Sequence, residues 1–182
     1  MGSTLNNLVW IDIETTGFYA YESKIIQIAV VVTDNKINIL DNKGLVIHTK
    51  IIQEDIDNIS NPKVIDMHTK NNLFKKSLES KITIEEAEKI IIEYISKYVN
   101  PKESPMCGNN VAFDRRFLEY HMHDLDEYLH HRLLDVSSIK NFMKLLNYPS
   151  YQKPEGTHEA FSDIKESINE LKYYLSEIEN NK

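Results

Sequence analysis

The order of hydrophobic patterns along this 182-residue chain predicts an α/β fold in which helices pack on a mixed sheet. Two observations carry this prediction. Strand-like apolar runs are concentrated in the first third of the chain, and amphipathic helical patterns alternate with short strand candidates over the remainder. Consecutive strands favour antiparallel pairing, whereas alternating strand–helix units favour parallel pairing, so we expect both directions in one sheet.

The first segments of the chain have the patterns of strands. Residues 8–13 form a short apolar run, and residues 24–34 form a longer run rich in Ile and Val. Residues 34–36 offer a turn, after which residues 37–52 predict one or two further strands, broken near residues 42–44. Together these segments indicate an antiparallel meander that begins the sheet.

Residues 84–99 have the pattern of an amphipathic helix. Thr83 and Glu86 match a capping box at its start. Asn100 and Pro101 would end it, because a residue that precedes proline disfavours the helical conformation. The apolar positions that recur at helical spacing are Ile84, Ala87, Ile91, Tyr94, Ile95 and Tyr98.

The second half of the chain alternates between strand and helix patterns. Residues 105–108 and 132–136 are short strand candidates, whereas residues 110–122, 137–146 and 157–178 have helical spacing. The helix over residues 110–122 is expected to carry one aromatic stripe of Phe113, Phe117 and Tyr120. The last helix is expected to turn a longer stripe inward, made of Phe161, Ile164, Ile168, Leu171, Leu175 and Ile178.

Length and composition limit the possible classes of protein. The chain fits one domain over residues 1–182, with residues 1–6 outside the ordered part and residues 180–182 as a tail. The single cysteine, Cys107, excludes an internal disulfide and fits a reducing compartment. No apolar run approaches the roughly 20 residues of a membrane span, and no secretory signal opens the chain. We therefore expect a soluble, cytoplasmic protein.

The formal net charge is −7 and the isoelectric point is about 5.5. This charge argues against a protein that grips long nucleic acid through a broad basic surface. It does not exclude a nucleic-acid enzyme, because bound metal ions add local positive charge. An acidic enzyme of this kind is expected to hold short pieces of nucleic acid at its site.

Two carboxylates lie at the end of the first apolar run. Side chains alternate across a strand, so Asp12 and Glu14 should point to the same face. Two neighbouring anions repel each other unless a positive group neutralises them. A hard divalent cation is the simplest candidate, because carboxylate oxygens suit Mg²⁺ and Mn²⁺.

Two further acids lie on apolar helix faces. Asp114 falls between Val111 and Leu118, and Asp163 has a similar position in the last helix. A carboxylate aimed at a core is costly unless it is paired or bound to metal. Four such carboxylates match a site in which two metal ions, about 3.5–4 Å apart, hold the oxygens of a phosphoryl displacement.

His158 lies five residues before Asp163. Five residues of a regular helix turn by about 140°, so the two side chains would not share a face. His158 is therefore better placed in the preceding loop or first turn, where it could accept a proton from a metal-bound water. Each feature alone has a simpler interpretation. The acid pair could lie in a solvated turn, a single Asp in a helix could lie at the boundary of the buried face, and His158 is one of seven histidines. The combination of these features favours a catalytic site.

The ordered motifs resemble the oligoribonuclease family of the DEDDh exonuclease superfamily. The resemblance extends from about Asn7 to Tyr174, and all four motifs occur in the order of that family. The segments that carry it are Trp10–Gly17, Cys107–Leu118, Arg132–Ser138 and Gly156–Ser167.

The resemblance implies a ribonuclease H-like fold, with a mixed five-stranded sheet and helices on both faces. It implies a homodimer that degrades short single-stranded RNA, dinucleotides above all, from the 3′ end to 5′-mononucleotides. Two divalent metal ions, Mg²⁺ or Mn²⁺, would be the cofactors. Asp12, Glu14, Asp114 and Asp163 fall on the metal ligands, and His158 falls on the general base.

The resemblance also implies substrate contacts. Phe18 falls where the family usually has a leucine that wedges against bases, and His68 falls on a histidine near the substrate. Arg132 and Ser137 fall on positions that cap the 5′ phosphate, in part from the partner subunit. Thr15 and Gly17 of the first motif, together with Asn110 and His131, complete the expected set of contacts.

The chain departs from the family pattern at three of its positions. Asn110 replaces a frequent Ser, Phe113 replaces a usual Gln, and His131 replaces a usual Tyr that reaches the neighbouring subunit. None of these changes removes a catalytic residue, but they could alter affinity or length preference.

Three other interpretations remain. One is another DEDDh exonuclease, such as a proofreading subunit or a ribonuclease T-like trimmer. A second is a non-catalytic nucleic-acid-binding module on the same fold, and a third is a structural dimer scaffold. The presence of all four acids and of His158 favours an enzyme over the last two.

Overall fold

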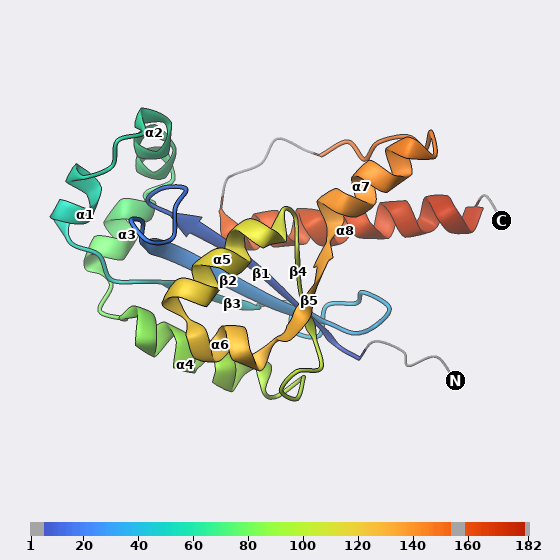
Figure 1. Cartoon of the computed structure of the whole chain (residues 1–182), viewed down its shortest axis with the longest axis horizontal. Helices are drawn as coiled ribbons and strands as arrows, with labels where there is room; N and C mark the ends of the chain where they lie inside the picture. Colours follow the sequence, from blue (N-terminus) through green and yellow to red (C-terminus); the bar gives the residue numbers. More distant parts are fainter. Residues whose placement is uncertain (1–5, 154–158, 181–182) are drawn as a thin grey trace.

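The computed structural model describes residues 6–153 and 159–180. Its centre is a five-stranded sheet in the order β3-β2-β1-β4-β5 (Figure 1). The strands are β1 (Leu8–Thr15), β2 (Ile25–Thr33), β3 (Leu45–His48), β4 (Pro105–Gly108) and β5 (His130–Asp135). Strands β1, β2 and β3 pair antiparallel, while β4 and β5 extend the sheet in parallel, so the predicted mixed sheet is confirmed.

Eight helices are found in the described ranges. The first three are short: α1 (Gln53–Asp57), α2 (Pro62–Lys70) and α3 (Leu73–Glu79). The next three helices are α4 (Ile84–Ile95), α5 (Val111–His121) and α6 (His123–Tyr128). The last two are α7 (Val136–Leu145) and α8 (Ala160–Asn180).

The helices cover both faces of the sheet, as expected. Alternate residues of β1 point to opposite faces, so Val9 and Ile11 belong to one core and Leu8 and Trp10 belong to the other. The first core also takes in buried side chains of α4, α5 and α6, and the second takes in those of α7 and α8. Asp12 lies two residues after Trp10 on β1, so its side chain points to the same face of the sheet, which α8 covers.

Several predicted elements are confirmed with small changes of boundary. Thr83 and Glu86 exchange the two hydrogen bonds of the predicted capping box at the start of α4. That helix ends at Ile95 rather than at residue 99, and the next residues continue as turns. The predicted start of the last helix, at residue 157, lies outside the described residues.

Other expectations were wrong. Leu175 is 42% exposed, so it does not belong to the inward stripe predicted for the last helix. In α8 the neighbouring Tyr174 is buried instead. Helices α1 to α3 were not predicted. Of the strands expected over residues 37–52, only β3 forms as a ladder, and Ile39 makes an isolated bridge with Thr33.

No helix in the described part of the chain is long and apolar enough to span a membrane.

Candidate active site

Three carboxylates meet at the end of the central strand. Asp12 and Glu14 lie on β1, and Asp163 lies in the first turn of α8. One carboxylate oxygen from each residue lies within 4.8 Å of those of the other two. The predicted convergence of residues far apart in sequence is therefore found for these three acids.

The fourth predicted acid lies beside this group. Asp114 is in the first turn of α5, which follows β4, the parallel neighbour of β1. Its side chain is 5% exposed, and its Oδ1 accepts a hydrogen bond of 3.1 Å from the backbone amide of Ile13. Ile13 separates Asp12 from Glu14, so this bond holds Asp114 at the acid pair.

Burial raises the pKa values of Asp12, Glu14 and Asp114, and repulsion between the site carboxylates adds to this for Asp12 and Glu14. Burial is the largest cause of the raised pKa of Asp12, and the charges of Asp114, Glu14 and Asp163 raise it further. The pKa of Glu14 is raised to about 8, first by burial and then by Asp163 and Asp114. The pKa of Asp114 is raised to about 7 by burial, against the lowering effect of the Ile13 amide. The carboxylates therefore resist ionisation until a cation neutralises them.

One lysine partly offsets this negative charge. The Nζ of Lys153 lies 2.9 Å from Oδ1 of Asp163, and the lysine side chain is 42% exposed. Its charge also lowers the pKa of Asp12, as the last of several causes. Sequence reasoning did not single out Lys153, because an exposed lysine in a loop carries no distinctive pattern.

The predicted substrate residue His68 lies against the acid pair. It is buried in α2, and its Nε2 lies 2.9 Å from the backbone oxygen of Thr15 and 3.9 Å from Oε2 of Glu14. Asn61 caps the start of α2, with Pro62 at the first helical position. The predicted general base, His158, lies outside the described residues.

The loop after β1 presents the next predicted contacts. The hydroxyl of Thr15 donates a hydrogen bond of 2.6 Å to the backbone oxygen of Gly17. A Cβ at Gly17 would lie 2.5 Å from the hydroxyl of Ser23, so a larger residue would have to displace that side chain. Phe18 follows with 59% exposure, and its ring meets the edge of Phe113 at a centroid distance of 6.5 Å.

The structure brings Asn110 and Ser137 together. The backbone amide of Asn110 donates hydrogen bonds to Oδ1 of Asp135 (3.0 Å) and to the hydroxyl of Ser137 (2.9 Å). Asp135 also caps the start of α7 by accepting from the amide of Ser137. The parallel pairing of β4 with β5 causes this proximity, because it places the two strand-to-helix turns side by side.

His131 and Arg132 lie farther along β5, which is an outer strand of the sheet. Both side chains are exposed, and the ring of His131 stacks on that of His130 at 4.2 Å between centroids.

Sequence reasoning missed a buried acid behind the site. Glu170 of α8 is 2% exposed; it accepts hydrogen bonds from Asn109 (2.8 Å) and Tyr174 (3.1 Å), and Nζ of Lys140 lies 3.3 Å away. It lies on the inward face of α8, and an acid at such a position was the same signal that identified Asp163. This cluster links α7 and α8 to the turn that carries Asn110.

The donor set fits divalent cations that prefer oxygen. The acid group offers only carboxylate oxygens, and these repel one another without a cation. Cys107 is buried in β4, and no sulfur takes part in the group. The four acids therefore suit Mg²⁺ or Mn²⁺ better than a soft metal.

A mixed five-stranded sheet with clustered acids at the end of its central strand defines an exonuclease-type fold. The exonuclease I of Methylocaldum szegediense has a similar fold, with a TM-score of 0.69 over 94% of this chain and 16% identity. An E. coli exonuclease I complex with single-stranded DNA gives a TM-score of 0.68 over 94% of this chain at 15% identity. The chain spans only 40% and 41% of those two proteins, respectively.

Sequence comparison identifies the family. The exonuclease family model RNase_T matches residues 9–171. An oligoribonuclease of Francisella tularensis subsp. novicida is 39% identical over 174 residues, which cover 95% of this chain and 96% of that protein. An oligoribonuclease of Legionella pneumophila is 39% identical over 189 residues, with 97% of each chain covered. The chain therefore belongs to the oligoribonuclease family of exonucleases.

Proposed function

We propose that this protein is a 3′-to-5′ exoribonuclease that hydrolyses short oligoribonucleotides, dinucleotides especially, to 5′-mononucleotides. The observation that carries the proposal is the cluster of Asp12, Glu14 and Asp163, with Asp114 beside it, in a chain 39% identical to oligoribonucleases. The same relatives favour this activity over that of a proofreading or ribonuclease T-like exonuclease. The intact set of acids disfavours a non-catalytic binding module.

The four acids would hold two divalent metal ions, Mg²⁺ or Mn²⁺. Such ions, when bound, lower the pKa of a coordinated water and stabilise the charge on the phosphate and on the leaving 3′ oxygen. The raised pKa values of Asp12 and Glu14 support this assignment, since they mark carboxylates whose ionisation needs a nearby cation. The Ile13 amide keeps Asp114 at the pair.

His158 would accept a proton from the attacking water. Its place in the chain, five residues before Asp163 and next to the start of α8, supports this role. A histidine suits proton transfer near neutral pH, because its unperturbed pKa is about 6.5.

The remaining expected residues would position the substrate. Thr15 and Gly17 shape the loop that exposes the ring of Phe18 for contact with bases, and buried His68 lies beside Glu14. The Asn110–Ser137 pair supports a phosphate-binding role, because both lie where two strand-to-helix turns meet.

We also propose that the enzyme acts as a homodimer whose interface includes β5 and α7. The outer strand β5 has unpaired backbone groups, which are suited to a second copy of the chain. Large apolar side chains around it are unusually exposed: Leu133, Phe142, Leu145 and Leu146. His131 and Arg132 on the same strand would then reach the partner's site. Light scattering on a Leu145→Asp variant tests this, with a monomer as the expected result.

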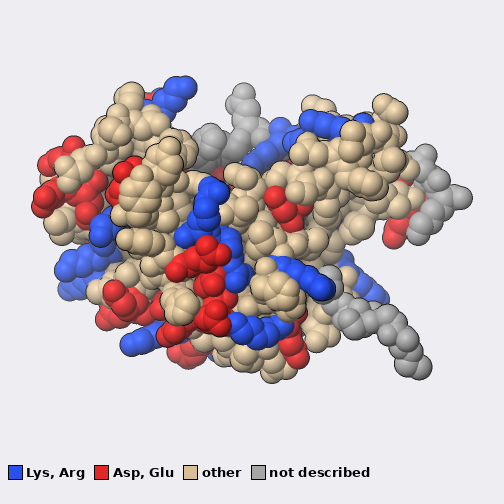
Figure 2. Space-filling view, in the orientation of Figure 1, with Lys and Arg blue, Asp and Glu red and all other residues tan. Residues whose placement is uncertain are grey.

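Residues 1–182 would form a single exonuclease domain acting in the cytoplasm. The family match over residues 9–171 and the buried single Cys107 support this assignment. Figure 2 shows Lys and Arg side chains interspersed with Asp and Glu on the face that it presents, an arrangement that suits short substrates.

A length series tests the proposed function. The purified protein is given 5′-labelled RNA of two to seven nucleotides, and DNA of the same lengths, with Mg²⁺ or Mn²⁺. We expect mononucleotide products and fastest turnover of the RNA dinucleotide. Faster turnover of long single strands or of DNA would contradict the proposal and favour another exonuclease of the superfamily.

A further inference from the structure

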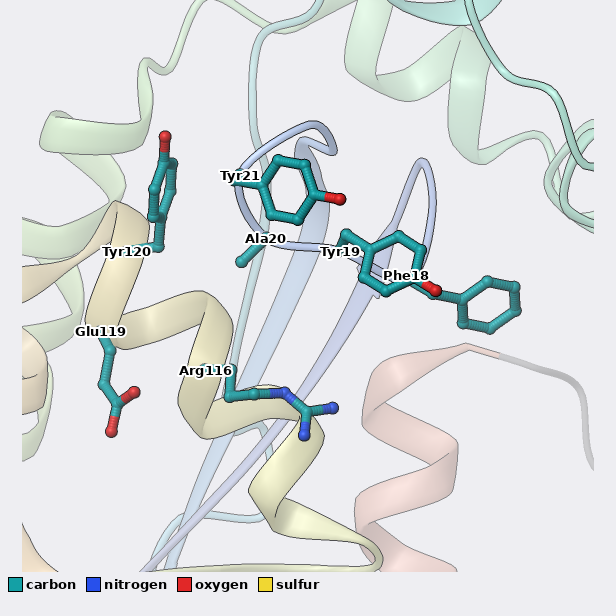
Figure 3. A pocket seen from close by; sticks show the side chains of 7 residues that line it. All are labelled: Phe18, Tyr19, Ala20, Tyr21, Arg116, Glu119 and Tyr120. Atoms are coloured by element: carbon teal, nitrogen blue, oxygen red, sulfur yellow. The ribbon is translucent and has the colours of Figure 1, made fainter.

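An aromatic pocket lies between the loop after β1 and helix α5 (Figure 3). Its volume is about 550 Å³, within the range of roughly 300–1,000 Å³ that is common for small-ligand sites. The side chains that line it include Phe18, Tyr19, Tyr21, Arg116, Glu119 and Tyr120.

Four aromatic rings in this pocket are unusually exposed. The exposed fractions are 59% for Phe18, 59% for Tyr19, 66% for Tyr21 and 60% for Tyr120. Tyr19 and Tyr21 lie with centroids 5.7 Å apart, and none of the four rings belongs to a hydrophobic core of the described chain. The fold therefore does not explain this concentration of aromatic surface, and such surfaces commonly mark binding sites.

The pocket is linked to the proposed catalytic site through the rings of Phe18 and Phe113. Phe18 lines the pocket and touches the edge of Phe113, the residue just before Asp114. The guanidinium carbon of Arg116 lies 5.9 Å from the centroid of the Phe113 ring. In the view of Figure 3, Phe18 and the Arg116 guanidinium lie toward the start of α8, whereas Tyr120 lies at the opposite side.

The charges of Arg116 and Glu119 favour one orientation of a bound nucleotide, with its phosphate beside Arg116. Arg116 is the only cation among the lining residues, and a guanidinium binds phosphate oxygens well. Glu119 would repel a phosphate near Tyr120, so the phosphate should stay at the Arg116 side. Exposed tyrosine rings can stack on any base, because every base has an aromatic face.

We propose that this pocket is a stacking subsite for a base of RNA substrates that are three or more nucleotides long, with Arg116 binding an adjacent phosphate. The inference rests on the proposed function, since it extends the substrate beyond the two nucleotides at the acids. A dinucleotide would leave the subsite empty. The Tyr21 and Tyr120 side chains would therefore affect longer RNA selectively.

The test compares a five-nucleotide RNA with a dinucleotide. Loss of a stacked base typically costs about 1–3 kcal/mol, so KM for the five-mer should rise roughly 5- to 150-fold in Tyr120→Ala and in Tyr21→Ala. The dinucleotide KM should stay unchanged in both variants. Tyr120→Phe keeps the ring and should restore the five-mer KM. Ile90→Ala, an exposed apolar position on α4, is the matched control and should alter neither substrate.

Two outcomes would overturn the subsite. One is an equal change for both substrates or no change for either; the other is a shift in oligomeric state, which would show that a second copy covers the pocket. If the wild-type protein cleaves no RNA, the proposed function fails. The subsite can then still be tested by measuring, through fluorescence anisotropy, the binding of a labelled five-nucleotide RNA. Equal binding by wild type and Tyr120→Ala would refute it.

Discussion

The backbone amide of Ile13 donates a hydrogen bond of 3.1 Å to the buried carboxylate of Asp114. This bond joins α5 to β1 between the two acids of the strand, so an element that begins about 100 residues later is fixed at the same point. Replacing the acceptor should therefore affect both folding and activity, and the two effects can be separated.

Asp114→Asn and Asp114→Ala should both abolish most turnover, because each removes a carboxylate from the proposed metal site. Asp114→Asn can still accept from Ile13, whereas Asp114→Ala leaves a buried amide without an acceptor. We expect Asp114→Ala to be less stable than Asp114→Asn by about 1–3 kcal/mol, measured by urea unfolding without metal. Equal stability of the two variants, or wild-type turnover in either, would contradict the assignment.

Stability without metal should depend on pH through Glu14. Its pKa in the folded chain, about 8, lies above its ordinary value of 4.5, so the protonated form stabilises the fold. That contribution is complete below about pH 4.5 and is lost as pH rises through about 8. We expect the gain in Tm from Mg²⁺ over EDTA to be larger at pH 8.5 than at pH 6. The Glu14→Gln variant should show a weaker pH dependence of this gain, and the remainder should come from Asp12 and Asp114, whose pKa values are also raised. An unchanged pH dependence in the variant would exclude a contribution from Glu14.

Lys153 should compete with metal for Asp163, because its Nζ lies 2.9 Å from the carboxylate. The ion pair is partly exposed, and such pairs contribute about 0.2–1 kcal/mol. Lys153→Gln should therefore tighten Mg²⁺ binding by about 1.5- to 5-fold, measured by calorimetry. Lys165→Gln removes the same charge from a position over the Phe161 ring and serves as the control. Weaker binding in Lys153→Gln would show that the lysine assists the site.

His158→Ala should lower kcat by about 10²–10⁴, the usual contribution of a general base. Metal binding and Tm should change little. His123→Ala, at an exposed position on α6, should behave as wild type. A change in KM with kcat intact would indicate that His158 contacts substrate without moving a proton.

Glu170 should stabilise the fold without touching substrate. Its buried carboxylate accepts from Asn109 and Tyr174 and lies near Lys140. Glu170→Gln removes the charge and one acceptor, so we expect a loss of about 1–3 kcal/mol in urea unfolding. Glu179→Gln, at an exposed position of the same helix, should be neutral. An unchanged unfolding midpoint in Glu170→Gln would mean that the cluster carries no net stabilisation.

Much of the fold follows from local patterns. Strand β2 is buried at every position and α4 has a complete capping box, so both were predicted from sequence with nearly correct boundaries. Helices α1 to α3 were missed because they are short, with five, nine and seven residues, which gives few turns over which a helical period can repeat. Leu175 was misplaced because helical spacing alone does not set the width of the buried stripe.

Some parts of the candidate site were also predicted from sequence, whereas others depend on the tertiary structure. The four acids were predicted from sequence because each combines a charge with an apolar setting, and three of them cluster in the structure. The contact of Asn110 with Ser137 depends on the parallel pairing of β4 with β5, which no local pattern specifies. Lys153 gave no signal, and the aromatic pocket brings together a loop and a helix that are about 100 residues apart.

Strand β1 carries the acid pair and also lies at the centre of the sheet, with one antiparallel and one parallel neighbour. Its Val9, Trp10 and Ile11 side chains are essentially inaccessible to solvent. Amide protons of such a strand exchange only when the whole molecule opens. Heating should therefore separate Asp12 from Glu14 only when the whole molecule unfolds.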